Sequence, residues 1–135
     1  MQTYTIWKND LEFESTYDGH HITLNGSTGD DGRRLGFGPK ALLLSGLAGC
    51  SGIDVVDILA KMKVTFDGLE ISAEAEQTDE HPKVFKEINI IYKVKTNPEN
   101  IGKVQRAVDL SLQKYCGVSA MLSKHSEIVS KVEIM

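Results

Sequence analysis

The side chains of this chain that could be chemically reactive are the thiols of its two cysteines, Cys50 and Cys116. Cys50 lies in the run GLAGCSGIDVVDILAKMKV, residues 46–64, which is apolar and helical in pattern but contains three glycines. A thiol in such a run has two interpretations. It is either a small apolar residue that eases packing or a reactive group that a substrate can reach.

The glycines around Cys50 predict a close contact. Gly46, Gly49, Cys50 and Ile53 fall on one side of a helix at this spacing. Each glycine in a helix costs about 1 kcal/mol relative to alanine. We therefore expect another backbone to approach this side closely, with Cys50 as a small buried residue in the packing interpretation.

The spacing of the possible ligands does not favour a metal site. The sequence has no CxxC pair, and its four histidines are scattered, so a metal site would need residues brought together from distant positions. We expect neither a metal nor an organic cofactor. With only two cysteines, a permanent disulfide is not expected in a reducing compartment either. The histidines are His20, His21, His81 and His125.

Length and composition indicate one ordinary globular domain, residues 1–135. Hydrophobic residues make up 41% and charged residues 25%, which is typical of such domains. A net charge of -4 argues against nucleic acid or an anionic membrane surface as a partner. No apolar run approaches the roughly 20 residues that span a bilayer, and the first residues lack a signal-peptide pattern. We expect a cytoplasmic protein with no membrane partner.

The N-terminal part predicts three short strands followed by a loop. TYTIWK and LEFES flank a turn at Asn9-Asp10, and HITLN follows a turn at Asp18-Gly19. Residues 26–38 contain five glycines and no periodicity, which predicts a loop. Loops of this length in compact domains are often functional.

A central helix and a hairpin follow the loop. Pro39 suits a first helical position, and the helix is expected to reach about Lys63 with apolar residues on nearly all sides, as in a buried helix. Apolar residues then alternate with polar ones in LEISAEAE, and Ile88, Ile90, Tyr92 and Val94 share one face of FKEINIIYKV. These segments predict an antiparallel hairpin with one exposed face.

The second cysteine follows a second helix. Asn97 and Pro98 suit the N-cap and first position of that helix. Its apolar stripe runs from Ile101 through Leu112 and, four residues later, reaches Cys116, while Gly117 is suited to end the helix. A helical turn in VSAMLSK and a strand from 128 to 135 complete an α+β pattern.

The quoted segments resemble the OsmC/Ohr family of osmotically inducible and organic-hydroperoxide-resistance proteins, in its OsmC-like redox-protein branch. The resemblance covers essentially the whole chain and is strongest in LAGCSGIDVV and AVDLSLQKYCGVSAML. It implies an OsmC-like fold, with antiparallel strands packed around two buried central helices. It also implies an intertwined homodimer with its active sites at the subunit interface.

The same resemblance implies a thiol peroxidase. Cys50 matches the family's peroxidatic cysteine and Cys116 its resolving cysteine. The substrate would be an organic hydroperoxide, and an external dithiol would reduce the enzyme without a metal or organic cofactor. The glycines would then let central helices meet while Cys50 faces a cavity.

One position departs from the family pattern. Family members place a glutamate after the proline that starts the central helix, where it orients an arginine over the thiolate; this chain has Lys40 there. A mid-helix thiol lacks the dipole of a helix N-terminus, so a reactive Cys50 needs a cation. Arg33 and Arg34, in the preceding loop, are the candidates. Asp54 cannot help, because a carboxylate raises a thiol pKa; a helix-surface or interface hydrogen bond suits it better.

Three functions remain open from the sequence. The first is a cysteine-based peroxidase for organic hydroperoxides. The second is a non-catalytic ligand-binding or redox-sensing module on the same fold, which the missing glutamate favours and the two cysteines oppose. The third is a purely structural dimer in which both thiols fill the core.

Overall fold

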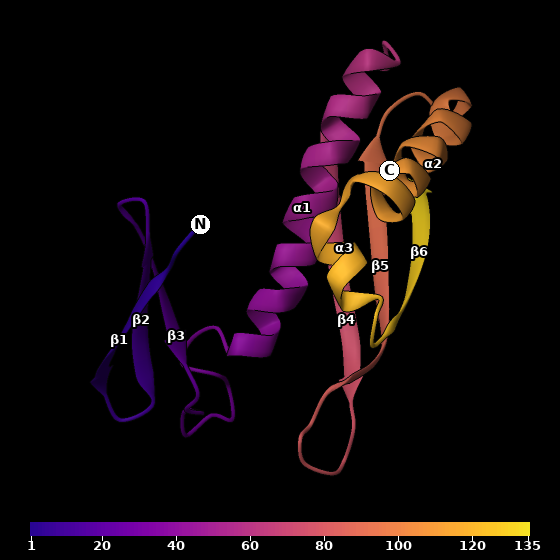
Figure 1. Ribbon diagram of the computed structural model, residues 1–135. Helices are drawn as coiled ribbons and strands as arrows, with labels where there is room; N and C mark the ends of the chain where they lie inside the picture. The colour runs from indigo at the N-terminus through magenta and orange to yellow at the C-terminus, as the bar shows by residue number, and fades with distance from the viewer. The chain divides into compact units, whose positions relative to one another are not determined.

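The computed structural model describes residues 1–135 as two compact units, Met1–Leu43 and Leu44–Met135. Both units are drawn in Figure 1. The sequence-based expectation of a single OsmC-like domain over residues 1–135 stays a prediction.

The first unit contains a three-stranded antiparallel sheet in the order β1-β2-β3. The predicted strands are present, and Asp18 and Gly19 form the second turn with positive φ angles of 47° and 78°. The first turn differs from the prediction by one position, because Asn9 still pairs with Glu12 and leaves Asp10 and Leu11 as the turn. The strands are β1 (Tyr4–Asn9), β2 (Glu12–Tyr17) and β3 (His20–Asn25).

The second unit is built on a sheet with the order β4-β5-β6. The strands are β4 (Gly68–Gln77), β5 (Phe85–Lys95) and β6 (Glu127–Ile134). β4 and β5 form the predicted antiparallel hairpin. β6 pairs parallel to β5, so the expectation of antiparallel pairing is wrong for this pair. A parallel neighbour needs a long crossover connection, and here that connection carries the helices.

The crossover from β5 to β6 contains four short helical segments. They are a 3-10 turn (Pro98–Asn100), α2 (Ile101–Leu110), a π-helical turn (Ser111–Tyr115) and α3 (Gly117–Leu122). Asn97 caps the first segment as predicted, since its side chain accepts a 3.1 Å hydrogen bond from the Glu99 N–H. The prediction that Gly117 ends a helix is wrong. Cys116 is the break in helical backbone, with φ −73° and ψ 105°, and Gly117 begins α3.

Helix α1 (Pro39–Lys61) is buried along one stripe only. Leu47, Ser51, Val55 and Leu59, each four residues apart, have no exposed surface. The other sides remain open, and Ile53 is 74% exposed, so burial on all sides is not found within this chain.

The core of the second unit joins α1, β5 and α2 (Figure 1). On β5 the four side chains predicted to share a face, Ile88, Ile90, Tyr92 and Val94, are all fully buried. Their alternation therefore identified the core face of this strand correctly. They cluster with Leu47, Val55 and Leu59 of α1 and with Val104, Ala107 and Val108 of α2.

Helix α1 is long and apolar enough to cross a membrane if judged by length and composition alone. Of its most apolar stretch of 18 residues, 22% is buried. The expectation that no apolar run is long enough to span a bilayer is therefore wrong for Pro39–Lys61. The core helix of a soluble protein passes the same test of length and composition.

Candidate functional site

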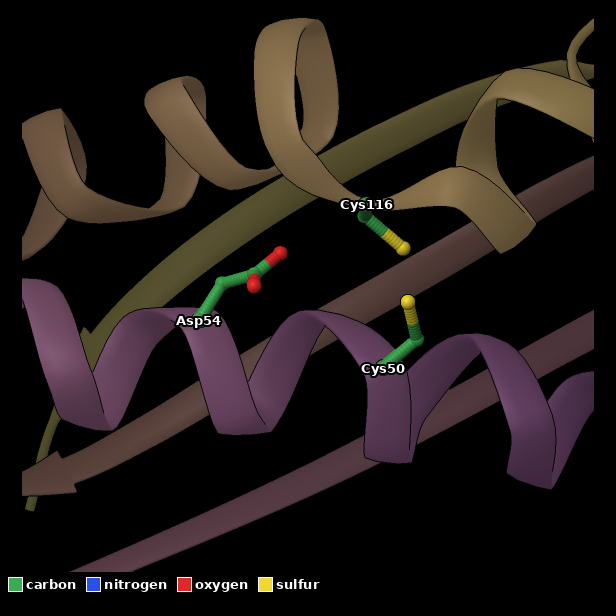
Figure 2. A group of neighbouring side chains, drawn as sticks. All are labelled: Cys50, Asp54 and Cys116. Carbon is green, nitrogen blue, oxygen red and sulfur yellow. The ribbon is translucent and has the colours of Figure 1, made fainter.

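Cys50 and Asp54 lie one turn apart on α1 and face the crossover that carries Cys116. Figure 2 shows the two sulfurs pointing toward one another and the Asp54 carboxylate directed into the same space. The two cysteine sulfurs and one carboxylate oxygen of Asp54 all lie within 4.8 Å of one another. The predicted approach of the two sulfurs is therefore observed, while their chemical roles stay predictions.

The two thiols differ in accessibility. Cys50 is half-buried, whereas Cys116 is buried, with 3% of its surface exposed. The Cys116 sulfur accepts a 3.3 Å hydrogen bond from the backbone N–H of Ser119. A small reactant in solvent can therefore meet Cys50 more readily than Cys116.

The surroundings of Cys116 favour its neutral form. Burial, a hydrogen bond with Cys50 and the nearby Asp54 carboxylate raise the pKa of the Cys116 thiol to about 11, although the Ser119 N–H acts in the opposite direction. At neutral pH this thiol keeps its proton. Cys116 is therefore better suited to react with an already oxidised Cys50 than to attack a substrate itself.

A buried polar network adjoins the thiols. The hydroxyl oxygens of Ser51 and Tyr92 lie 2.6 Å apart, and Ser111 Oγ lies 2.8 Å from Ser51 Oγ and 3.0 Å from Asp54 Oδ2. Burial raises the pKa of Tyr92 to about 12, with the Ser51 hydrogen bond opposing the shift. The network joins β5, α1 and the crossover, and it fixes one oxygen of Asp54.

Ser111 also determines where Cys116 lies. The Cys116 backbone N–H donates a 2.8 Å hydrogen bond to the Ser111 carbonyl, five residues earlier, which is the π-helical spacing. A single residue thus holds Asp54 through its side chain and Cys116 through its backbone. Sequence reasoning missed Ser51, Tyr92 and Ser111 as site residues. It assigned Asp54 a helix-surface or interface hydrogen bond, and the bond found here is a part-buried one from Ser111 Oγ.

Arg33 and Arg34, the predicted cations, belong to the first unit. Both are exposed there. The Arg33 backbone N–H donates a 3.0 Å hydrogen bond to Asp31 Oδ1, and Arg34 Nη1 donates one of 3.3 Å to the Gly26 carbonyl. Their predicted influence on Cys50 stays a prediction.

The glycines of α1 differ in what surrounds them. A Cβ built on Gly52 would lie 2.9 Å from Cδ1 of Ile71 on β4, whereas one built on Gly46 or Gly49 would meet no heavy atom within 4 Å. The close neighbour of Gly52 is a side chain and not the predicted backbone. Gly46 and Gly49 thus form part of an open face on α1.

Cys50, Asp54 and Cys116 are also the residues that could share a metal ion. The spacing of cysteines and histidines gave no sign of this cluster, because its members come from distant parts of the chain. Its one local signal was the four-residue interval between Cys50 and Asp54.

Comparison with known proteins identifies the family of this chain. A family model described as OsmC-like protein matches residues 29–131. The chain belongs to the OsmC-like family. It is 35% identical to Protein YhfA of Escherichia coli strain K12, over 100% of this chain and 98% of that protein.

Solved structures of OsmC-like proteins share the fold. An OsmC-like protein from Mycoplasma pneumoniae is similar at 20% identity with a TM-score of 0.82, over 99% of this chain and 94% of that one. The organic hydroperoxide resistance protein OhrB of Bacillus subtilis is similar at 16% identity with a TM-score of 0.67, over 100% and 98%. The predicted family and the α+β, OsmC-like fold are therefore confirmed.

Proposed function

We propose that this OsmC-like protein is a thiol peroxidase that reduces organic hydroperoxides. Cys50 is its peroxidatic residue and Cys116 its resolving residue. The observation that carries the proposal is the pairing of two free thiols of unequal accessibility, with sulfurs no more than 4.8 Å apart. Family membership and the structural likeness to the organic hydroperoxide resistance protein OhrB of Bacillus subtilis support it.

The proposed reaction has two steps within the protein. The Cys50 thiolate attacks the distal oxygen of ROOH, the O–O bond breaks, and the alkoxide takes a proton to leave as an alcohol while Cys50 becomes a sulfenic acid. The Cys116 sulfur then displaces the hydroxyl of that sulfenic acid, and a disulfide and water form. An external dithiol reduces the disulfide, so the cycle needs no metal or organic cofactor.

The protein is further proposed to act as a cytoplasmic homodimer. An open and mainly apolar hollow is lined by residues of α1 and β4, among them Gly49, Gly52, Ile53 and Ile71. Burial of such a face in a second copy would remove apolar surface from water. The cytoplasm would keep both cysteines reduced between cycles.

Substitution of each cysteine tests the peroxidase proposal. Cys50→Ser should abolish consumption of cumene hydroperoxide, because an alcohol cannot replace a thiolate at neutral pH. Cys116→Ser should consume one equivalent and stop at a sulfenic acid that dimedone traps. Wild-type protein that consumes no hydroperoxide with any of several dithiols would overturn the proposal.

The role of an arginine is tested separately. We propose that Arg33 or Arg34 favours the thiolate form of Cys50, since a reactive cysteine needs a cationic neighbour. Arg33→Ala and Arg34→Ala should each be compared with wild type in the rate of Cys50 alkylation at pH 7. Equal rates in all three proteins would exclude both residues.

A ligand-binding or redox-sensing module is the second candidate. The observation that favours it is Lys40, which occupies the position of the family's glutamate. Such a protein would form the Cys50–Cys116 disulfide slowly. Steady-state kinetics with an excess of recycling dithiol distinguish the two by rate, because slow oxidation of a sensor limits its turnover even when the disulfide is reduced at once.

A further inference from the structure

The thiol cluster presents the donor set of a metal site. Two thiol sulfurs, from Cys50 and Cys116, and a carboxylate oxygen of Asp54 lie within 4.8 Å of one another. A tetrahedral Zn²⁺ with bonds of about 2.3 Å to sulfur holds two thiolates about 3.8 Å apart. Side-chain shifts of about 1 Å are therefore enough to place the three donors around one ion.

The types of the donors select the class of metal. Thiolate sulfur is a soft ligand that prefers Zn²⁺ and its heavier relative Cd²⁺, whereas Mg²⁺ and Ca²⁺ prefer oxygen. Two thiolates and a carboxylate also repel one another when all are charged, and a dication between them removes that repulsion. Three protein ligands leave a fourth tetrahedral position for water.

Hydrogen bonds outside the cluster already orient two of the donors. Ser111 Oγ lies 3.0 Å from Oδ2 of Asp54, which leaves Oδ1 available to a metal. The Ser119 N–H donates to the Cys116 sulfur at 3.3 Å. Such outer contacts are typical of metal ligands, because they fix the direction in which each donor points.

We propose that the reduced protein binds one divalent cation of the zinc class through Cys50, Asp54 and Cys116. Each thiol that binds gives up its proton to solvent. The bound ion occupies both sulfurs, so the metal-bound form does not react with peroxides. The inference goes beyond the peroxidase proposal and does not depend on it, because binding requires only reduced thiols.

Titration of the reduced full-length protein with Cd²⁺ tests the site. We expect one Cd²⁺ per chain and an ultraviolet sulfur-to-cadmium charge-transfer band. Cys50→Ser and Cys116→Ser should each weaken binding by more than about 100-fold. Asp54→Asn should weaken it by at least about 10-fold, since loss of an outer contact alone costs about 10- to 100-fold. Asp57→Asn is the matched control, because Asp57 is an exposed carboxylate on the same helix and pairs with Lys61.

Wild-type protein provides a second measurement that needs no substitution and so does not depend on the folding of a variant. One equivalent of Zn²⁺ should slow alkylation of Cys50 at least about tenfold, and a chelator should restore the rate. The inference is overturned if no charge-transfer band forms, if Cys116→Ser binds as tightly as wild type, or if Asp54→Asn behaves like Asp57→Asn. Cadmium binding without hydroperoxide consumption would leave this inference standing and remove the peroxidase proposal.

Discussion

Tyr92 and Ser51 share a buried hydrogen bond, with 2.6 Å between the phenolic and seryl oxygens. Neither side chain has exposed surface. The bond joins the middle strand of the β4-β5-β6 sheet to α1 at the residue next to Cys50, and Ser111 extends it to Asp54. The polar network is therefore part of what positions the thiols.

Removal of the Tyr92 hydroxyl should destabilise the protein. We expect Tyr92→Phe to lower the free energy of unfolding by about 1 kcal/mol, because the ring still fills the core and one buried hydrogen bond is lost. Urea denaturation under reducing conditions measures the change. Tyr115→Phe is the control, since Tyr115 is 54% exposed, and an equal loss in both variants would contradict the prediction.

Stability should fall in strong alkali because of the same residue. Burial raises the pKa of Tyr92 to about 12, from a usual value near 10. Between these values the unfolded chain has lost this proton and the folded protein still holds it, so the free energy of unfolding decreases as pH rises. The pKa of Cys116 is raised as well, so the test compares wild type with Tyr92→Phe. From pH 9 to 12 the free energy of unfolding should fall by roughly 2 kcal/mol less in the variant than in wild type. Parallel curves from pH 9 to 12 would exclude Tyr92 as a contributor.

The two cysteines should react with alkylating reagents at different rates. At pH 8 we expect iodoacetamide to modify Cys50 at least about tenfold faster than Cys116, because Cys116 is buried and its pKa is raised to about 11. Mass spectrometry of peptides from a time course gives both rates. Dilute denaturant should reduce the difference, and faster modification of Cys116 in the folded protein would be inconsistent with the described site.

The apolar face of α1 should mediate self-association. Ile53 is 74% exposed on this face, so Ile53→Asp is expected to weaken a dimer by at least about tenfold, equivalent to 1.4 kcal/mol. Ile101→Asp is the control, because Ile101 is 46% exposed on a different helix. Sedimentation velocity measures the change, and a wild-type protein that stays monomeric at micromolar concentration would refute the homodimer.

Sequence patterns predicted most of the elements of the fold. Alternation identified the buried face of β5, and Asn97 was recognised as a cap because its side chain can accept a backbone hydrogen bond beside Pro98. Alternation gives the face of a strand but not its direction, so the parallel pairing of β5 and β6 was missed. A π-helical turn has no sequence signal that separates it from α-helix. The sequence therefore predicts one helix running to Cys116, where the structure has α2 followed by a π-helical turn.

The candidate site was predictable in its cysteines but not in their surroundings. Cys50 and Cys116 were identified by their resemblance to a family motif. Ser51 and Ser111 are ordinary polar residues within helices, and no spacing rule relates two side chains 60 positions apart. Their contact exists only because the crossover packs against α1, which is a tertiary effect.

The approach of Cys50 and Cys116 also bears on the entropy of the unfolded chain. The segment between them holds all of β4, β5 and α2. A bond between the two sulfurs would close a loop of about 65 residues, and in the chain-entropy account such a closure stabilises the folded state by about 4 kcal/mol. Each oxidation would thus make the protein harder to unfold or to digest, so its resistance to proteolysis would record its redox state.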